Sequence, residues 1–248
     1  FVMYPLATLY NRGSLVNVPR RTDFGVDVAG VENALDDRTK VIFVCSPNNP
    51  TGNPTPVADI LRLLNSGRIV VLDEAYAEFA GYSHATLVTE YSNLVVLRTM
   101  SKWAGLAGLR LGYAIVDPSV TEEMAKIKSP YNVGLAAQVG GIASLHDKEY
   151  LMRNVRRLVQ ERERLYVLLQ DLPYGRVYPS ETNFLCWSTD YSESGVRADE
   201  LRMALVRRGV LVRAFNTPIE ALRVSIGTPD ESDIFLDALR DAYGELAG

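Results

Sequence analysis

Residues 94–110 read LVVLRTMSKWAGLAGLR, an apolar run followed at once by a loop that carries a lysine and ends in an arginine. The first four residues have the length and β-branched content of a buried strand. Lys102 would therefore stand just beyond a buried strand, where desolvation disfavours the ammonium and makes the amine a nucleophile toward carbonyl groups. Arg110, with the hydroxyls of Thr99 and Ser101, would suit a phosphate ester. Taken alone, the stretch fits a solvated loop with ordinary charges equally well.

A second apolar strand ends in an acid, because residues 70–76 read VVLDEAY. Asp73 would lie at the carboxyl end of this strand, which is the edge of an open α/β sheet where ligands bind. Its carboxylate would suit a cationic ring nitrogen, and Tyr76 would offer a phenol three residues later. The alternative is that Asp73 only caps the N-terminus of a helix.

A third apolar run leads into a tight loop, because residues 41–52 read VIFVCSPNNPTG. The prolines and the glycine fix a turn that could present the side-chain amide of Asn49 to a ring oxygen. The same dipeptides also mark any tight loop, so this motif is open to a purely structural explanation.

The three strand ends follow one another as Asn49, then Asp73 with Tyr76, then Lys102 with Arg110. In this order the chain resembles the fold type I aminotransferases that use pyridoxal 5'-phosphate, and it is most similar to their histidinol-phosphate aminotransferase branch. The matching stretches are SPNNPTG at 46–52, DEAY at 73–76, SKWAGLAGLR at 101–110, PYNV at 130–133 and LRVSIGT at 222–228. Each motif alone is weak, but their order and strand contexts agree from about residue 16 to the C-terminus.

The resemblance implies a catalytic set made of Lys102, Asp73 and Tyr76. Lys102 would form a Schiff base with the aldehyde of pyridoxal phosphate and later carry the proton that moves during the reaction. Asp73 would keep the pyridine nitrogen protonated, which makes the ring an electron sink. Tyr76 and Asn49 would hydrogen-bond the phenolic oxygen of the ring.

The resemblance also implies two sets of anion ligands. Thr99, Ser101 and Arg110 would bind the cofactor phosphate. Arg223 would pair with the α-carboxylate of the substrate, and Arg213 would favour a second anion such as a substrate phosphate. Either of the last two arginines could instead be an ordinary surface residue.

The implied reaction transfers an amino group from L-histidinol phosphate to 2-oxoglutarate, giving imidazole-acetol phosphate and L-glutamate, in histidine biosynthesis. A homodimer is also implied. One alternative is a lyase on the same scaffold that decarboxylates a phosphorylated amino acid. Another is a catalytically inactive cofactor-binding or assembly module, because Ala7 stands where family members carry a ring-stacking aromatic and the chain begins at Phe1 without their upstream arm and phosphate-binding turn.

Composition excludes several other classes. The chain has 248 residues with 26 basic and 30 acidic side chains and a net charge of −4, and it lacks the basic stripe of a nucleic-acid binder. Cys45 and Cys186 lie in apolar runs, which predicts core thiols rather than a disulfide or a metal pair. His84 and His146 are isolated from any spacing typical of a hydrolase or a zinc site. The absence of membrane-length apolar runs and of a visible signal peptide predicts a cytoplasmic protein.

The alternation of strands and helices predicts an α/β protein with a mostly parallel central sheet flanked by helices and a smaller C-terminal α/β domain, the fold of type I pyridoxal-phosphate transferases. We expect a large cofactor-binding domain over 1–147, then a linking helix and the small domain over 148–248. Strands are expected near 41–46, 69–73, 94–99, 111–116, 183–187, 210–213 and 222–226. Helices are expected at 57–64, 135–145, 147–172, 198–208 and 231–243, with one more capped by Ser119.

Overall fold

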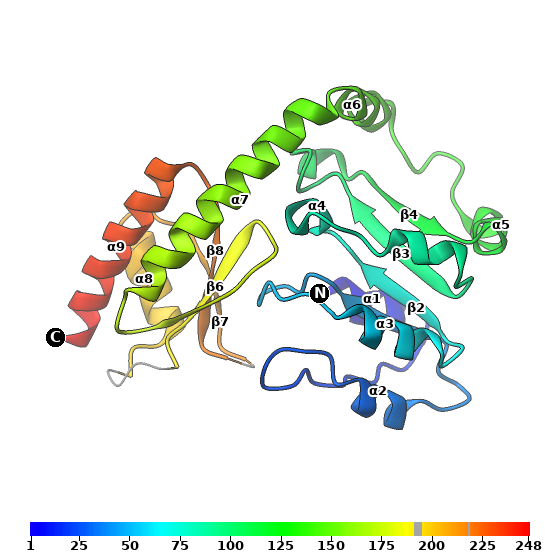
Figure 1. Cartoon of the computed structure of the whole chain (residues 1–248), viewed down its shortest axis with the longest axis horizontal. Coiled ribbons are helices and arrows are strands. Elements are labelled where there is room, and N and C mark those ends of the chain that lie inside the picture. Colours follow the sequence, from blue (N-terminus) through cyan, green and yellow to red (C-terminus); the bar gives the residue numbers. More distant parts are fainter. Residues whose placement is uncertain (191–194, 218) are drawn as a thin grey trace. The chain divides into compact units, whose positions relative to one another are not determined.

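The structure, a computed structural model, describes residues 1–190, 195–217 and 219–248 (Figure 1). The chain divides into two compact units, the first made of Phe1–Asn49 and Asn53–Leu151 and the second of Pro50–Gly52 and Met152–Gly248. The assignment of 1–147 and 148–248 as cofactor-binding and small domains stays a prediction.

The first unit contains a four-stranded sheet in the order β1-β2-β3-β4. Strands β1 (Val41–Cys45), β2 (Ile69–Asp73) and β3 (Leu94–Thr99) are parallel, and β4 (Gly112–Val116) runs antiparallel to β3. The predicted α/β class with a mostly parallel sheet is therefore confirmed. The helical elements that the structure places with this sheet are α1 (Met3–Tyr10), α2 (Val28–Ala34), α3 (Val57–Leu64), α4 (Ala77–Ala80), η1 (Ala85–Thr89), η2 (Ala107–Leu109), α5 (Pro118–Ile127) and α6 (Leu135–His146).

The core of the first unit forms because its central strands are apolar along their whole length, as strands of a covered parallel sheet must be. Leu72, Leu94 and Val96 have no exposed surface. The apolar face of α3 contributes Ile60 and Leu63 to the same cluster. Helical spacing of apolar residues thus placed α3 correctly from the sequence, with the predicted bounds.

The start of α5 differs from the prediction. Asp117, not Ser119, caps the helix, because the carboxylate of Asp117 accepts the backbone N–H of Ser119 at 2.9 Å. Pro118 takes the first helical position, where its missing N–H has no intrahelical partner to lose.

The second unit contains an antiparallel sheet in the order β5-β6-β8-β7. Its strands are β5 (Arg176–Tyr178), β6 (Phe184–Ser188), β7 (Arg213–Phe215) and β8 (Ala221–Ser225), and its helices are α7 (Lys148–Gln170), which starts in the first unit, α8 (Ala198–Arg207) and α9 (Pro229–Ala247). Trp187, Leu201, Leu222 and Leu239 are fully buried in a core separate from that of the first unit.

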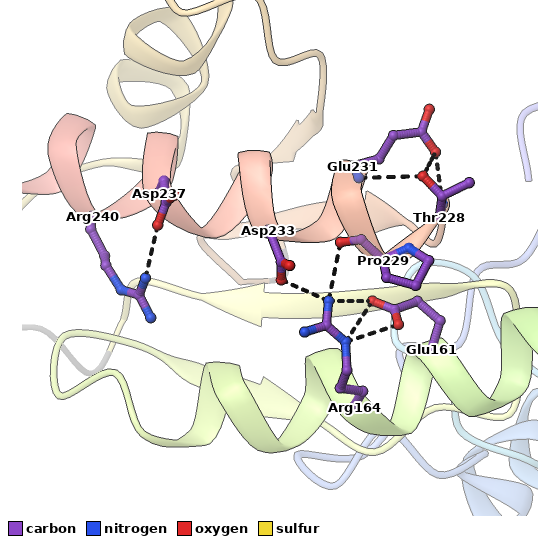
Figure 2. A network of polar contacts seen from close by, with 8 residues as sticks. All are labelled: Glu161, Arg164, Thr228, Pro229, Glu231, Asp233, Asp237 and Arg240. Carbon is purple, nitrogen blue, oxygen red and sulfur yellow. Dashed lines mark hydrogen bonds and ion pairs between the residues drawn. The ribbon is translucent and has the colours of Figure 1, made fainter.

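A polar network joins α7 to α9 within the second unit (Figure 2). The guanidinium of Arg164 donates to Glu161 at 2.9 Å, to Asp233 at 2.7 Å and to the carbonyl of Pro229 at 3.1 Å. Glu161 is only 6% exposed, so Arg164 compensates a carboxylate that has lost most of its water. Within the described ranges, no helix is long and apolar enough to cross a membrane.

Candidate active site

The three strands that precede the predicted site loops reach the same edge of the sheet, where β1 and β2 end in register and β3 continues two residues further to Thr99. Cys45 pairs with Asp73 in the β1–β2 register, and Asp73 pairs with Leu97 in the β2–β3 register. The parallel ladder continues one step into the loops, where the N–H of Ser46 donates to the carbonyl of Asp73 at 3.0 Å and that of Glu74 donates to Leu97 at 2.9 Å. The loops that carry Asn49, Asp73 and Lys102 therefore leave one edge of the sheet, as ligand sites of open α/β sheets require.

The half-buried carboxylate of Asp73 has two defined partners. Its Oδ1 accepts the backbone N–H of Ala75 at 3.1 Å, and its Oδ2 accepts the hydroxyl of Tyr4 at 2.5 Å. The residue that caps α4 is Tyr76, so the alternative role of Asp73 as a helix cap is not what the structure shows. Asn49, in the loop after β1, is half-buried.

Lys102 and Tyr76 lie beside each other. The Nζ of Lys102 is 5.9 Å from the centroid of the buried Tyr76 ring. Lys102 itself is exposed, while the next two residues, Trp103 and Ala104, are buried. The prediction that Lys102 is desolvated is therefore wrong. The chain turns at the end of the strand, and the side chains of Trp103 and Ala104 are buried there in place of Lys102.

The loop from 99 to 110 holds the predicted phosphate ligands. The hydroxyl oxygen of Thr99 accepts the backbone N–H of Ser101 at 3.1 Å, which brings these two residues together. Arg110 is exposed in a left-handed backbone conformation with φ 53°, and its guanidinium donates to the carbonyl of Ala107 in its own loop at 2.9 Å.

The residue after Asp73 anchors this edge through a buried ion network that sequence reasoning missed. Glu74, 2% exposed, accepts from Ser83 Oγ at 2.5 Å, from the N–H of His84 at 2.7 Å and from Arg98 at 3.3 Å. Arg98 also donates to Glu78 at 2.6 Å. The sequence signal for this network was Arg98, which follows four apolar residues in its strand. A guanidinium in such a position needs a buried acid as its partner.

Tyr4 is the second contributor that sequence reasoning missed. The prediction considered Ala7 in this segment, but Ala7 is exposed on α1, whereas Tyr4, three residues earlier, reaches Asp73. Residues three apart lie on nearly the same face of a helix, so a helical interpretation of the segment would have included Tyr4. A groove of about 990 Å³ in the first unit is lined by Tyr4 and Phe43 but not by Lys102, so it does not coincide with the candidate site.

Arg213 and Arg223 belong to the second unit, where they are direct cross-strand partners on β7 and β8. Directly opposite residues of an antiparallel pair project from the same face, and like charges there repel. The guanidinium carbon of Arg213 lies 5.2 Å from the centroid of the Phe215 ring, and that of Arg223 lies 5.0 Å from the centroid of the Phe184 ring. Such a pair of cations is stabilised by an anion bound between or beside them.

The family model for aminotransferase class I and II matches residues 1–239 of the chain, and this match spans both units. The chain belongs to this family. Histidinol-phosphate aminotransferase from Roseiflexus castenholzii is 47% identical to this chain over 97% of its residues, and chloroplastic histidinol-phosphate aminotransferase 1 from Arabidopsis thaliana is 41% identical over 98%. The chain spans 66% of the length of the first relative and 58% of the second.

Solved structures agree with the class I and II fold. The histidinol-phosphate aminotransferase of Clostridium acetobutylicum has a TM-score of 0.90 at 21% identity, covering 99% of this chain and 76% of that one. The enzyme from Sinorhizobium meliloti, solved in complex with pyridoxal-5'-phosphate, has a TM-score of 0.86 at 26% identity, covering 99% and 69%.

Proposed function

We propose that this chain is the larger part of a pyridoxal-phosphate-dependent aminotransferase that converts L-histidinol phosphate and 2-oxoglutarate to imidazole-acetol phosphate and L-glutamate in histidine biosynthesis. The names of the relatives at 47% and 41% identity support the substrate. The observation that carries the proposal is that Lys102 lies beside Tyr76 at the sheet edge that also holds Asp73.

The residues at this edge fit pyridoxal phosphate by their chemistry. An exposed amine at Lys102 can meet an aldehyde, and the acceptor-only carboxylate of Asp73 can meet a protonated ring nitrogen. Tyr76 and Asn49 supply a phenol and an amide for the ring oxygen, and Thr99, Ser101 and Arg110 supply two hydroxyls and a guanidinium for the phosphate. Such a cofactor, when bound, supplies an electron sink for the carbanion at the substrate α-carbon.

The side chains of this chain do the binding and the proton movement. The amine of Lys102 would take a proton from the substrate α-carbon and return it to the carbon that derives from the cofactor aldehyde, acting first as general base and then as general acid. Asp73 orients the ring nitrogen through a carboxylate that is itself fixed by Tyr4 and Ala75. Arg223 holds the α-carboxylate of 2-oxoglutarate and L-glutamate, and Arg213 takes the phosphate of L-histidinol phosphate.

Cofactor attachment is tested by the visible absorption spectrum of the purified chain with added pyridoxal phosphate, before and after borohydride reduction. We expect a reducible band, and a peptide map that places the reduced label on Lys102. Lys102→Ala should lose both, whereas Lys126→Ala, which removes another exposed lysine, should keep both. A label at another lysine, or no band with the wild-type chain, would contradict the proposal.

Substrate choice is tested with two arginine variants and two amino donors, one with a phosphate and one without. With L-glutamate and L-histidinol phosphate as the two donors, Arg223→Gln should weaken the binding of L-glutamate, which carries the α-carboxylate that Arg223 binds. Arg213→Gln should weaken the binding of L-histidinol phosphate, which carries a phosphate and no carboxylate. Loss of a hydrogen-bonded ion pair predicts an increase of about tenfold or more in KM. Equal effects of Arg213→Gln on the two donors would remove it from phosphate recognition.

Product analysis separates the two reactions and the inactive module considered for this sequence. Transamination leaves a keto product and L-glutamate in equal amounts, decarboxylation releases carbon dioxide, and an inactive binding module gives neither while still showing the absorption band. We expect the first outcome.

The homodimer stays a prediction that sedimentation equilibrium checks, and the cytoplasmic location likewise stays a prediction.

A further inference from the structure

Tyr4 is the side chain of α1 that reaches the carboxyl edge of the parallel sheet. Its hydroxyl lies 2.5 Å from Oδ2 of Asp73 and 2.9 Å from Sγ of Cys45. Its ring stacks on Phe43, with centroids 4.8 Å apart and planes 13° apart. The Tyr4 side chain therefore contacts Asp73 at the end of β2 and two residues of β1, Cys45 and Phe43.

The direction of these hydrogen bonds follows from the groups involved. An ionised carboxylate only accepts, so the single proton of Tyr4 is donated to Asp73. The S–H of Cys45 is then left to donate to the phenolic oxygen. Burial, and after it the neighbouring Cys45 and Asp73, raise the pKa of Tyr4, so the phenol keeps the proton that this arrangement needs.

The contacts immobilise the carboxylate of Asp73. Tyr4 binds one oxygen and the N–H of Ala75 binds the other, so rotation of the carboxylate about its bond to the chain would break at least one of the two. The Tyr4 ring cannot follow such a rotation, because its stacking on Phe43 and its contact with Cys45 hold it from the side of β1.

We propose that Tyr4 is a positioning residue for the cofactor, and that its hydroxyl fixes the orientation in which Asp73 meets the pyridine nitrogen. This inference rests on the proposed function. It extends the site from the three strand-end loops to helix α1, and it gives Cys45 an indirect part as the donor that orients the phenol.

The test is Tyr4→Phe, which removes the hydroxyl and keeps the ring that stacks on Phe43. The dissociation constant of pyridoxal phosphate is measured by absorbance titration, and the ring nitrogen is observed directly by ¹⁵N NMR with ¹⁵N-labelled cofactor. We expect binding about tenfold weaker, since hydrogen bonds to charged groups are among the stronger ones. The ¹⁵N resonance should move toward the position of an unprotonated pyridine.

Two controls separate positioning from a general loss of structure. Tyr10→Phe removes a hydroxyl from the same helix at a residue that is 78% exposed, and it should change neither readout. Cys45→Ala keeps the bond between Tyr4 and Asp73 and should shift the ¹⁵N resonance less than Tyr4→Phe does. The thermal unfolding midpoints of all variants show that the fold is retained.

The outcomes distinguish this inference from the function on which it rests. A wild-type chain that fails to bind pyridoxal phosphate overturns the proposed function and the inference together. A wild-type chain that binds it, with an unchanged dissociation constant and ¹⁵N resonance in Tyr4→Phe, overturns only the role of Tyr4. A loss of affinity without any movement of the ¹⁵N resonance also overturns it, because the hydroxyl would then act on something other than the ring nitrogen.

Discussion

Gly52 shows how a single position closes the loop that carries Asn49. Its φ is +77°, and a Cβ atom added there would lie 2.3 Å from the Oγ and 2.9 Å from the Cα of Ser180. The backbone of Gly52 also accepts the N–H of Glu181 at 2.9 Å. Only a residue without a side chain allows both this conformation and this approach of two backbone segments.

We therefore expect Gly52→Ala to destabilise the protein by about 3 kcal/mol, since backbone strain and a steric clash add. Gly67→Ala is the matched control, because Gly67 also has positive φ, at +71°, but a Cβ there meets nothing within 4 Å. It should cost only about 1 kcal/mol of backbone strain. Urea denaturation measures both losses, and equal values would show that the contact with Ser180 is unimportant.

At the scale of elements, one arginine of α7 makes polar contacts with α9. Arg164 reaches Glu161 in its own helix and Asp233 in α9, whereas Arg240 pairs with Asp237 one turn away in the same helix (Figure 2). The contacts of Arg164 are costly to break because Glu161 is buried. The pair of Arg240 and Asp237 contributes little, since these side chains are 51% and 77% exposed.

Arg164→Met should lower the free energy of unfolding by about 2 kcal/mol, because it leaves Glu161 buried without its guanidinium. This loss of unfolding free energy is smaller than for a fully buried ion pair, since Arg164 is itself 38% exposed. Arg240→Met should change it by less than about 0.5 kcal/mol, as is typical of exposed pairs. Losses of similar size for the two variants, measured by urea denaturation, would refute this account of the network.

At the scale of the whole molecule, each unit has its own hydrophobic core and one cysteine. Cys45 belongs to the first unit and Cys186 to the second. Burial raises the pKa of both thiols, that of Cys186 to about 12. Because only the thiolate reacts, a raised pKa protects each thiol in the folded state, and this protection ends when the thiol is released into water on unfolding.

At pH 8 the native chain should resist alkylation by iodoacetamide, since roughly one Cys186 thiol in ten thousand is ionised at a pKa of about 12. With increasing urea, each cysteine should become reactive when its own unit unfolds. Separate cores predict two different midpoints, which mass spectrometry of the two peptides can follow. A single shared midpoint would show that the units unfold as one.

The sequence was sufficient for the elements whose local signals agree. Helix α3 has the predicted bounds, and β2 ends at Asp73 as expected, because helical spacing and an unbroken apolar run are properties of neighbouring residues. The loops of Asn49, Asp73 and Lys102 could likewise be placed at one edge, since parallel strands end together. Helices α1 and α2 and strand β5 were not predicted, and α2 and β5 are short, with seven and three residues.

The sequence by itself determined the α/β class, the order of the strand-end motifs and the family, since all of these depend on which residues follow one another along the chain. Only the tertiary structure decided that Tyr4 meets Asp73, that Arg98 compensates Glu74, and that Lys102 is exposed beside Tyr76. These contacts join residues that are 69, 24 and 26 positions apart in the sequence. Local propensity carries no information about such pairs, because they form only when strands and helices pack.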